Sequence, residues 1–203
     1  MGRPANPNRR PELLSQILEH VATSSLSRVT FRSLAGALGV STYVLVYHFG
    51  SRRDLIDAIL DESVRMRREA LEGVDVEALS REEMLAWMRE AFITSLEPRH
   101  LPGIRLQFEA GSLESIDPDI GTRITDSYAV WNELFAGWLR RQDVPETEVD
   151  RLALHITNCL FGTQFGYLIS GDRAATIDVF DIALATTVGQ IDAVRAGIPA
   201  VTK

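Results

Sequence analysis

The sequence predicts an all-α protein of about nine helices, with an N-terminal three-helix domain containing a helix-turn-helix in residues 1–53 and a second helical domain in 54–203. Apolar residues recur at helical spacing along most of the chain, and capping residues and glycines separate the segments. Hydrophobic residues make up 45% of the 203 residues, which is enough to build a proper core.

Residues 30–53 predict two short helices joined by a tight turn. One apolar face of the first helix is formed by residues at i, i+3, i+4 and i+7: Phe31, Leu34, Ala35 and Leu38. Gly39 can end that helix in the left-handed conformation, with Val40 folding back onto it. Ser41 can then cap the next helix. The order of helix, glycine turn and capped helix is that of a helix-turn-helix.

The segment Tyr43–Tyr47 is rich in aromatic and β-branched residues, which favour strands. We nevertheless predict a helix, because Leu45 and Phe49 stand one helical turn apart and a strand would have no partner strand in this chain. With Leu45 directed inward, Tyr43 and Tyr47 face outward and the valines at positions 44 and 46 lie on the flanks. The outward face is therefore aromatic and apolar.

Such a face needs a partner, and the major groove of DNA suits it. Valine and tyrosine edges can contact thymine methyl groups, while Thr42 and the tyrosine hydroxyls can bond base edges or phosphates. Arg32, Arg52, Arg53 and His48 can hold the flanking phosphates. The alternative is a small helical subdomain whose tyrosines are buried against the rest of the chain.

The same region resembles the DNA-binding domain of the TetR family of transcriptional regulators. The residues that carry the resemblance are Ile17, Leu18, Val21, Thr30 to Arg32, Leu34, Ala35, Leu38 to Ser41, Leu45, His48, Phe49 and Ser51 to Leu55. It implies DNA contacts by Thr30, Arg32, Ser41, Thr42, Tyr43, Tyr47, His48 and Arg52, and we add Val44 because its edge can contact a thymine methyl group. Two positions depart from the family pattern: Val46 replaces a tyrosine, and Tyr43 replaces a small residue or proline.

The charge distribution suggests that the protein approaches DNA by one end. Residues 1–53 hold seven arginines against Glu12 and Glu19, a net charge of +5, whereas the remainder carries −12. The basic part can neutralise phosphates while the acidic part is repelled. Arg3, Arg9 and Arg10 are predicted to form a flexible arm that follows the duplex.

We expect a cytoplasmic protein that neither spans nor binds a membrane. The single cysteine cannot form an internal disulfide, no apolar run approaches the length that crosses a bilayer, and the polar, proline-rich start is unlike a signal peptide.

Beyond residue 50 the sequence predicts six further helices. Ser51 with Asp54 caps one that runs to about residue 72, and Ser80 with Glu83 caps one that stops before Pro98. A short helix is expected over 104–110, and Asp117 with Pro118 is expected to begin a long one ending near residue 141. The last two are expected over 146–170 and 174–196.

These last two helices are apolar on more than one side, so each needs two neighbours. Gly162 and Gly166 stand four residues apart and permit close approach of a second backbone. In the TetR family such a pair builds a four-helix dimer interface, and a dimer suits a palindromic operator. We assign to the interface Cys159, Gly162, Thr163, Gly166, Phe180, Leu184, Val188 and Ile191. The alternative is that both faces are buried within one subunit.

In the family, the helices of the second domain surround an effector cavity. The resemblance therefore assigns effector contacts to Trp87, Phe92, Gln107, Phe108, Tyr128, Trp131, Phe135, His155 and Asn158, with Gln164 as a further polar group. Aromatic walls with few polar groups suit a small apolar or aromatic molecule, although the same spacing also describes a plain core. We expect a repressor whose effector binds the conformation with misplaced recognition helices, with no cofactor.

Three other readings remain open. His155 and Cys159 share a helix face and could form a metal pair of a metal-responsive regulator, or a thiol and its base in an enzyme. No third ligand, phosphate loop or nucleophile motif accompanies them, so we predict neither a metal site nor catalysis. The third reading is a dimeric adaptor that binds proteins through Tyr43 and Tyr47; its binding would respond weakly to salt.

Overall fold

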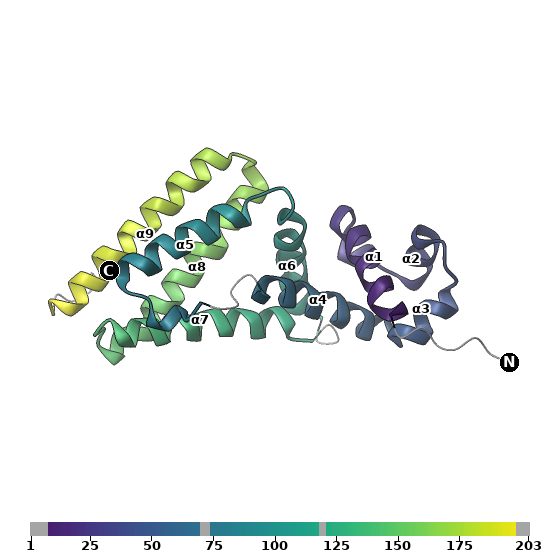
Figure 1. The fold of residues 1–203 in the computed structure, drawn as a ribbon, viewed down its shortest axis with the longest axis horizontal. Coiled ribbons are helices and arrows are strands. Elements are labelled where there is room, and N and C mark those ends of the chain that lie inside the picture. Colours follow the sequence, from purple (N-terminus) through teal and green to yellow (C-terminus); the bar gives the residue numbers. More distant parts are fainter. Residues whose placement is uncertain (1–7, 70–73, 118–120, 198–203) are drawn as a thin grey trace. The chain divides into compact units, whose positions relative to one another are not determined.

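The computed structural model describes residues 8–69, 74–117 and 121–197, and these contain helices without any β-strand, which confirms the all-α prediction. Two 3-10 helices, η1 (Leu26–Arg28) and η2 (Val76–Ala78), accompany the α-helices. The α-helices are Arg9–Thr23 (α1), Phe31–Leu38 (α2), Thr42–Phe49 (α3), Arg52–Glu69 (α4), Arg81–Ser95 (α5), Leu101–Glu114 (α6), Arg123–Arg141 (α7), Glu146–Ser170 (α8) and Arg173–Arg195 (α9) (Figure 1).

The described residues form two compact units, each with its own core. Unit 1 lies within Met1–Leu71 and Arg105–Thr125, and unit 2 lies within Glu72–Ile104 and Asp126–Lys203. Unit 1 therefore includes α4 and most of α6 in addition to the three N-terminal helices. The predicted functional boundary at residue 53 stays a prediction.

The helix-turn-helix of unit 1 has the predicted local structure. Gly39 is left-handed, with φ 66°, and the Val40 N–H donates to the carbonyl of Ala35 at 3.1 Å, as expected of a glycine-terminated helix. The Ser41 hydroxyl accepts from the Val44 N–H at 3.3 Å and begins α3. The segment that favours strands by composition is thus a helix, because Leu45 and its neighbours gain a core that an isolated strand would lack.

Helix α6 fastens the corner between α1 and η1 through two charged side chains, which we call the α6 clamp: Arg105 and Glu109. Nη2 of Arg105 donates to the carbonyls of Val21, Ala22 and Ser24 at 2.9, 2.6 and 3.1 Å. These carbonyls lie at the C-terminal end of α1, where backbone carbonyls have no N–H partner within the helix. The clamp therefore satisfies one helix end with a positive charge, the sign that the helix dipole favours there.

Glu109 completes the clamp on the η1 side. Its carboxylate accepts from the Ser25 hydroxyl and from the Ser27 N–H at 3.1 Å. Burial opposes ionisation, but these hydrogen bonds, one from the Leu26 backbone and the charge of Arg105 together lower the pKa of Glu109. The ionised carboxylate is therefore the form that this corner stabilises.

Two predicted helix boundaries in the middle of the chain are wrong. Helix α7 begins at Arg123, not at Asp117, and Pro118 lies outside the described residues. The carboxylate of Glu114 on α6 accepts from the N–H groups of Ile124 and Thr125 at 2.8 and 3.0 Å, so a distant side chain supplies the cap. Helix α6 itself spans 101–114, longer than the predicted 104–110.

The predicted N-terminal arm also needs correction. Arg9 and Arg10 lie in the first turn of α1 and are not part of a flexible tail, while Arg3 lies outside the described residues. Nε of Arg10 donates to the carbonyl of His48 at 3.2 Å, and its guanidinium lies 5.3 Å from the ring centroid of Phe49. Arg10 thus ties the start of α1 to the end of α3.

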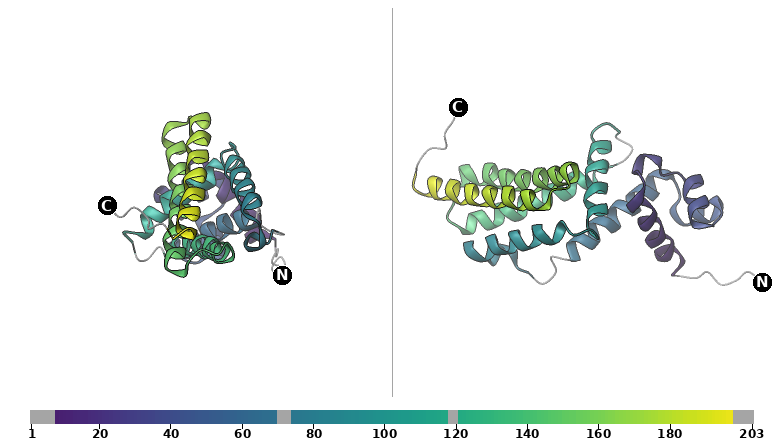
Figure 2. Two further views of the ribbon diagram at one scale, coloured as in Figure 1. Left: turned by 90° about the vertical axis from the view of Figure 1, so that its left-hand side faces the viewer. Right: turned by 90° about the horizontal axis from the view of Figure 1, so that it is seen from above.

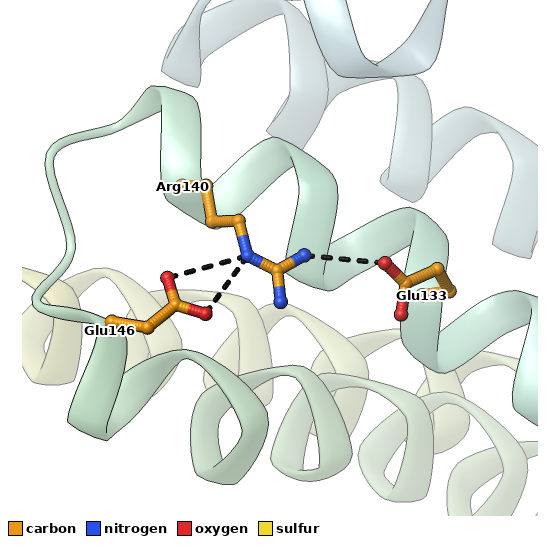
Figure 3. A network of polar contacts seen from close by, with 3 residues as sticks. All are labelled: Glu133, Arg140 and Glu146. Atoms are coloured by element: carbon orange, nitrogen blue, oxygen red, sulfur yellow. Dashed lines mark hydrogen bonds and ion pairs between the residues drawn. The ribbon is translucent and has the colours of Figure 1, made fainter.

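Unit 2 is built around α5, α7, α8 and α9. Figures 1 and 2 show α8 and α9 running side by side as a hairpin, joined by a short turn at Gly171. Arg89 of α5 makes two hydrogen bonds to Asp181 of α9, at 2.8 and 3.1 Å. At the α7–α8 turn, Arg140 bridges Glu146 and Glu133 (Figure 3), with Nε 3.1 Å from Glu146 Oε1 and Nη1 3.2 Å from Glu133 Oε1.

Among the described helices, α9 is long and apolar enough to cross a membrane by length and composition alone. Its Phe180 and Ile191 are 1% exposed in the core of unit 2, and Asp181 and Asp192 pair with arginines of α5. Such a helix, which packs one face into a core, does not suggest a membrane protein.

Candidate DNA-binding surface

The predicted DNA contacts of the helix-turn-helix gather on α3 and on the start of α2. Thr30 caps α2 in a capping box with Ser33, its hydroxyl accepting from the Ser33 N–H at 3.0 Å. Arg32, on the first turn of α2, is exposed, as are Ser41 and Thr42 at the start of α3. These side chains, at the N-terminal ends of α2 and α3, are therefore accessible to a ligand.

Tyr43 and Tyr47 are the most exposed large apolar side chains of α3, and they face outward as predicted. Their side chains are 76% and 69% exposed, and their rings stack with centroids 6.5 Å apart and planes 25° apart. The ring of His48 meets Tyr47 edge-on at 5.0 Å. The alternative in which the tyrosines are buried against the rest of the subunit is therefore wrong.

One predicted contact on α3 changes place. Val44 is half-buried and packs against the core of unit 1, whereas Val46 is 47% exposed. The valine available to a ligand is thus Val46, which the residue assignment omitted. Helical spacing could have found it, since Val46 lies next to Tyr47 and three residues from Tyr43.

The arginines near α3 differ in whether their side chains are hydrogen-bonded within the subunit. Arg52 is exposed, but its Nε donates to the carbonyl of Val29 at 3.1 Å, so this side chain also joins α4 to the loop before α2. Arg53 and Arg32 are exposed, and neither side chain donates a hydrogen bond to another described residue. Sequence reasoning missed both the structural bond of Arg52 and the docking of Arg10, because each partner is a backbone carbonyl distant in sequence.

The predicted effector residues do not form one set in the structure. Phe92 and Phe135 are each 1% exposed in the core of unit 2, and Phe92 stacks on Phe180 at 3.8 Å. Both side chains thus pack in this core, and their assignment to an effector cavity stays a prediction. Gln107, which is buried, and Phe108 belong to unit 1, whereas the other seven belong to unit 2.

The partly exposed members of this set that belong to unit 2 make separate contacts there. The hydroxyl of Tyr128 bonds Oδ1 of Asn158, and its ring meets Phe161 edge-on at 5.3 Å. Trp131, packed against the core like Trp87, stacks on Phe135 at 5.8 Å. Gln164 Nε2 donates to the Ser95 hydroxyl at 3.0 Å, so this amide is already engaged.

His155 and Cys159 lie together on α8, with Sγ 3.8 and 3.7 Å from the two ring nitrogens. Burial raises the pKa of the Cys159 thiol, and burial together with the charge of Arg151 lowers the pKa of His155. A raised thiol pKa disfavours the thiolate that a nucleophile or metal ligand requires. Within the described residues, no group of three or more His, Cys, Asp or Glu side chains could hold a metal ion.

The predicted dimer residues divide into two groups. Gly162 and Gly166 are exposed, and a Cβ at either position would meet nothing within 4 Å. Cys159, Thr163 and Val188 are half-buried. Phe180, Leu184 and Ile191 are in the core of unit 2, so their assignment is corrected: helical spacing was read on the wrong side of α9.

The α8–α9 hairpin exposes five large apolar side chains that the predicted dimer residues did not include. They are Leu154, Phe165, Ile169, Val179 and Ile182, with exposures of 45, 47, 73, 54 and 66%. We call them the hairpin face.

No protein-family model matches the chain. The nucleoid occlusion factor SlmA of Aliivibrio fischeri (strain MJ11) is 30% identical over 131 residues, covering 61% of this chain and 66% of the relative, just under two thirds of its length.

Solved structures match over most of the chain. A TetR transcription regulator from Haloarcula marismortui is 15% identical with a TM-score of 0.71, covering 93% of this chain and 99% of that one. A regulator from Saccharomonospora viridis, crystallised with choline, is 19% identical with a TM-score of 0.69, covering 91% and 97%. The predicted resemblance is thus confirmed: this chain has the fold of the TetR-family transcriptional regulators.

Proposed function

We propose that the protein is a sequence-specific DNA-binding transcriptional regulator that places α3 in the major groove. The observation that carries this proposal is the open aromatic face of α3, with Tyr43 and Tyr47 more than two-thirds exposed beside exposed arginines. Exposed aromatic and apolar side chains on a capped two-helix turn are typical of a helix that meets base edges. The contrast between a +5 N-terminal segment and a −12 remainder supports approach by this end.

Salt dependence tests this proposal against a protein-binding adaptor. Affinity for a selected duplex should fall steeply with salt through counterion release, and Arg32→Ala should make that slope shallower by about one unit. Arg32 suits the test because its exposed side chain has no hydrogen bond or ion pair with the rest of the described structure. Arg173→Ala, at the exposed start of α9, is the matched control and should leave the slope unchanged. Affinity independent of salt would contradict the proposal.

We further infer that two copies associate through the hairpin face. Its five side chains are open to water, and the adjacent Gly162 and Gly166 leave room for a neighbouring backbone. Two copies would present two copies of α3 to successive major grooves about 34 Å apart, as a palindromic operator requires. Gly162→Leu or Gly166→Leu should give monomers that bind operator poorly, and sedimentation of an unchanged dimer would contradict this assignment.

The regulator is proposed to be a cytoplasmic repressor released by a small apolar or aromatic effector. The half-buried Trp87, Trp131 and Tyr128 of unit 2 support this, with Asn158 bonded to the Tyr128 hydroxyl and His155 as a further polar group of the same unit. Choline, although a cation, is a first probe, because a protein with the same fold was crystallised with it and aromatic faces bind quaternary ammonium groups. An effector should raise the thermal midpoint of the protein and lower its affinity for operator, whereas a molecule that binds without changing operator affinity is no effector.

A further inference from the structure

The recognition helix α3 lacks every side chain that reads a base by two hydrogen bonds. Its eight residues, Thr42–Phe49, contain no arginine, lysine, asparagine, glutamine, aspartate or glutamate. Arginine or lysine reads guanine, asparagine or glutamine reads adenine, and a carboxylate accepts from cytosine. Helix α3 can therefore recognise a base only by single hydrogen bonds and by apolar contact.

Apolar contact is what the open side of α3 offers. Tyr43, Val46 and Tyr47 are its exposed large side chains, at 76, 47 and 69%. On the base edges of the major groove, the C5 methyl of thymine is the apolar group. Phosphates cannot satisfy Val46, which has no polar atom in its side chain.

We propose that thymine methyl groups are the main sequence signal that α3 reads, with Tyr43, Val46 and Tyr47 as the specificity-determining residues. This inference rests on the proposed function, since it requires α3 to enter the major groove. It names the class of site: a half-site whose central major-groove edge carries thymines.

The stacked ring pair fixes a spacing for these thymines. The ring centroids of Tyr43 and Tyr47 are 6.5 Å apart, and two base steps of B-DNA span about 6.8 Å along the axis. The two rings can therefore rest over base pairs two steps apart, with Val46 on the same side of the helix. The edge contact from His48 helps to hold Tyr47 in place.

The experiment replaces thymine by uracil, which removes the methyl and keeps every hydrogen-bonding group. Duplexes bound by the full-length protein are first selected from random DNA, and each thymine of the selected half-site is then changed to deoxyuridine. Loss of one buried methyl should weaken binding about fourfold per position. Uracil placed outside the half-site is the matched control and should have no effect.

Two variants at Tyr43 separate methyl contact from hydrogen bonding. Tyr43→Phe keeps the ring and should keep the discrimination between thymine and uracil, whereas Tyr43→Ala should lose it at one position. Because Tyr43 is exposed, neither change should disturb folding.

Two outcomes would separate a failure of this inference from a failure of the proposed function. Salt-dependent binding of a selected sequence with equal affinity for its uracil form would overturn this inference and leave the proposed function intact. Failure to select any duplex would overturn the proposed function itself.

Discussion

Replacing Glu109 by glutamine tests whether the α6 clamp stabilises unit 1 through its charge. The wild-type carboxylate accepts hydrogen bonds from the Ser25 hydroxyl, the Ser27 N–H and the Leu26 backbone. A hydrogen bond to a charged group contributes about 1.5–3 kcal/mol, but the side chain is half-buried and the amide of glutamine still accepts. After discounting for solvent screening, we expect Glu109→Gln to cost about 1–2 kcal/mol at pH 7.

The pH dependence gives this prediction its specific signature. The pKa of Glu109 is lower in the folded chain than its ordinary value of 4.5, so the unfolded chain binds the proton more readily. The stabilisation is therefore complete above pH 4.5 and is lost as the pH falls through the folded pKa. The difference between wild type and Glu109→Gln should therefore shrink as the pH falls below 4.5 and through the lowered pKa of the folded chain.

Urea denaturation at pH 7 and at low pH measures this difference as a change in midpoint at constant slope. In a thermal scan the same loss should lower the midpoint by about 2–8 °C at neutral pH. Glu90→Gln is the matched control, because Glu90 is an exposed glutamate of α5. An equal deficit at both pH values, or none at pH 7, would refute the electrostatic account of the clamp.

Three further changes probe the fold. Gly39→Ala should destabilise the protein by about 1 kcal/mol, because the residue must adopt φ 66° although a Cβ there meets nothing within 4 Å; an unchanged urea midpoint would contradict this. Ser80→Ala should cost about 1 kcal/mol by removing the cap bonded to the Glu83 N–H at 3.3 Å, with loss of helical circular dichroism at a lower temperature. Phe92→Ala should cost about 3–5 kcal/mol by emptying its place against Phe180, and calorimetry showing a smaller loss would mean that the core refills the space.

Local signals in the sequence predicted most of the helices and the open side of α3. Gly39, Ser41, and Ser80 with Glu83 act within one turn of their own position, so their effect is visible in a short window. The tyrosines could be placed because Leu45 had to face the core. This is why the helix assignment of α3 survived its strand-like composition.

What the sequence did not reveal depends on contacts between distant segments. The Glu114 cap of α7, the docking of Arg10 at His48 and the Arg52 bond to Val29 each join a side chain to a backbone group elsewhere in unit 1. Which side of α9 is buried also depends on its neighbours, so Phe180 was assigned to the wrong face. Periodicity identifies an apolar stripe but not the surface that will cover it.

Val179 and Ile182 of α9 are exposed to water, and this exposure affects the stability of a newly synthesised chain before it finds a partner. A partner that binds only the folded form raises the apparent stability by mass action. A self-associating protein is therefore more stable at higher concentration. The thermal midpoint should therefore rise as the protein concentration is raised from nanomolar to micromolar. A scarce chain would then be the form most vulnerable to proteolysis, which would link the abundance of this protein to its own turnover.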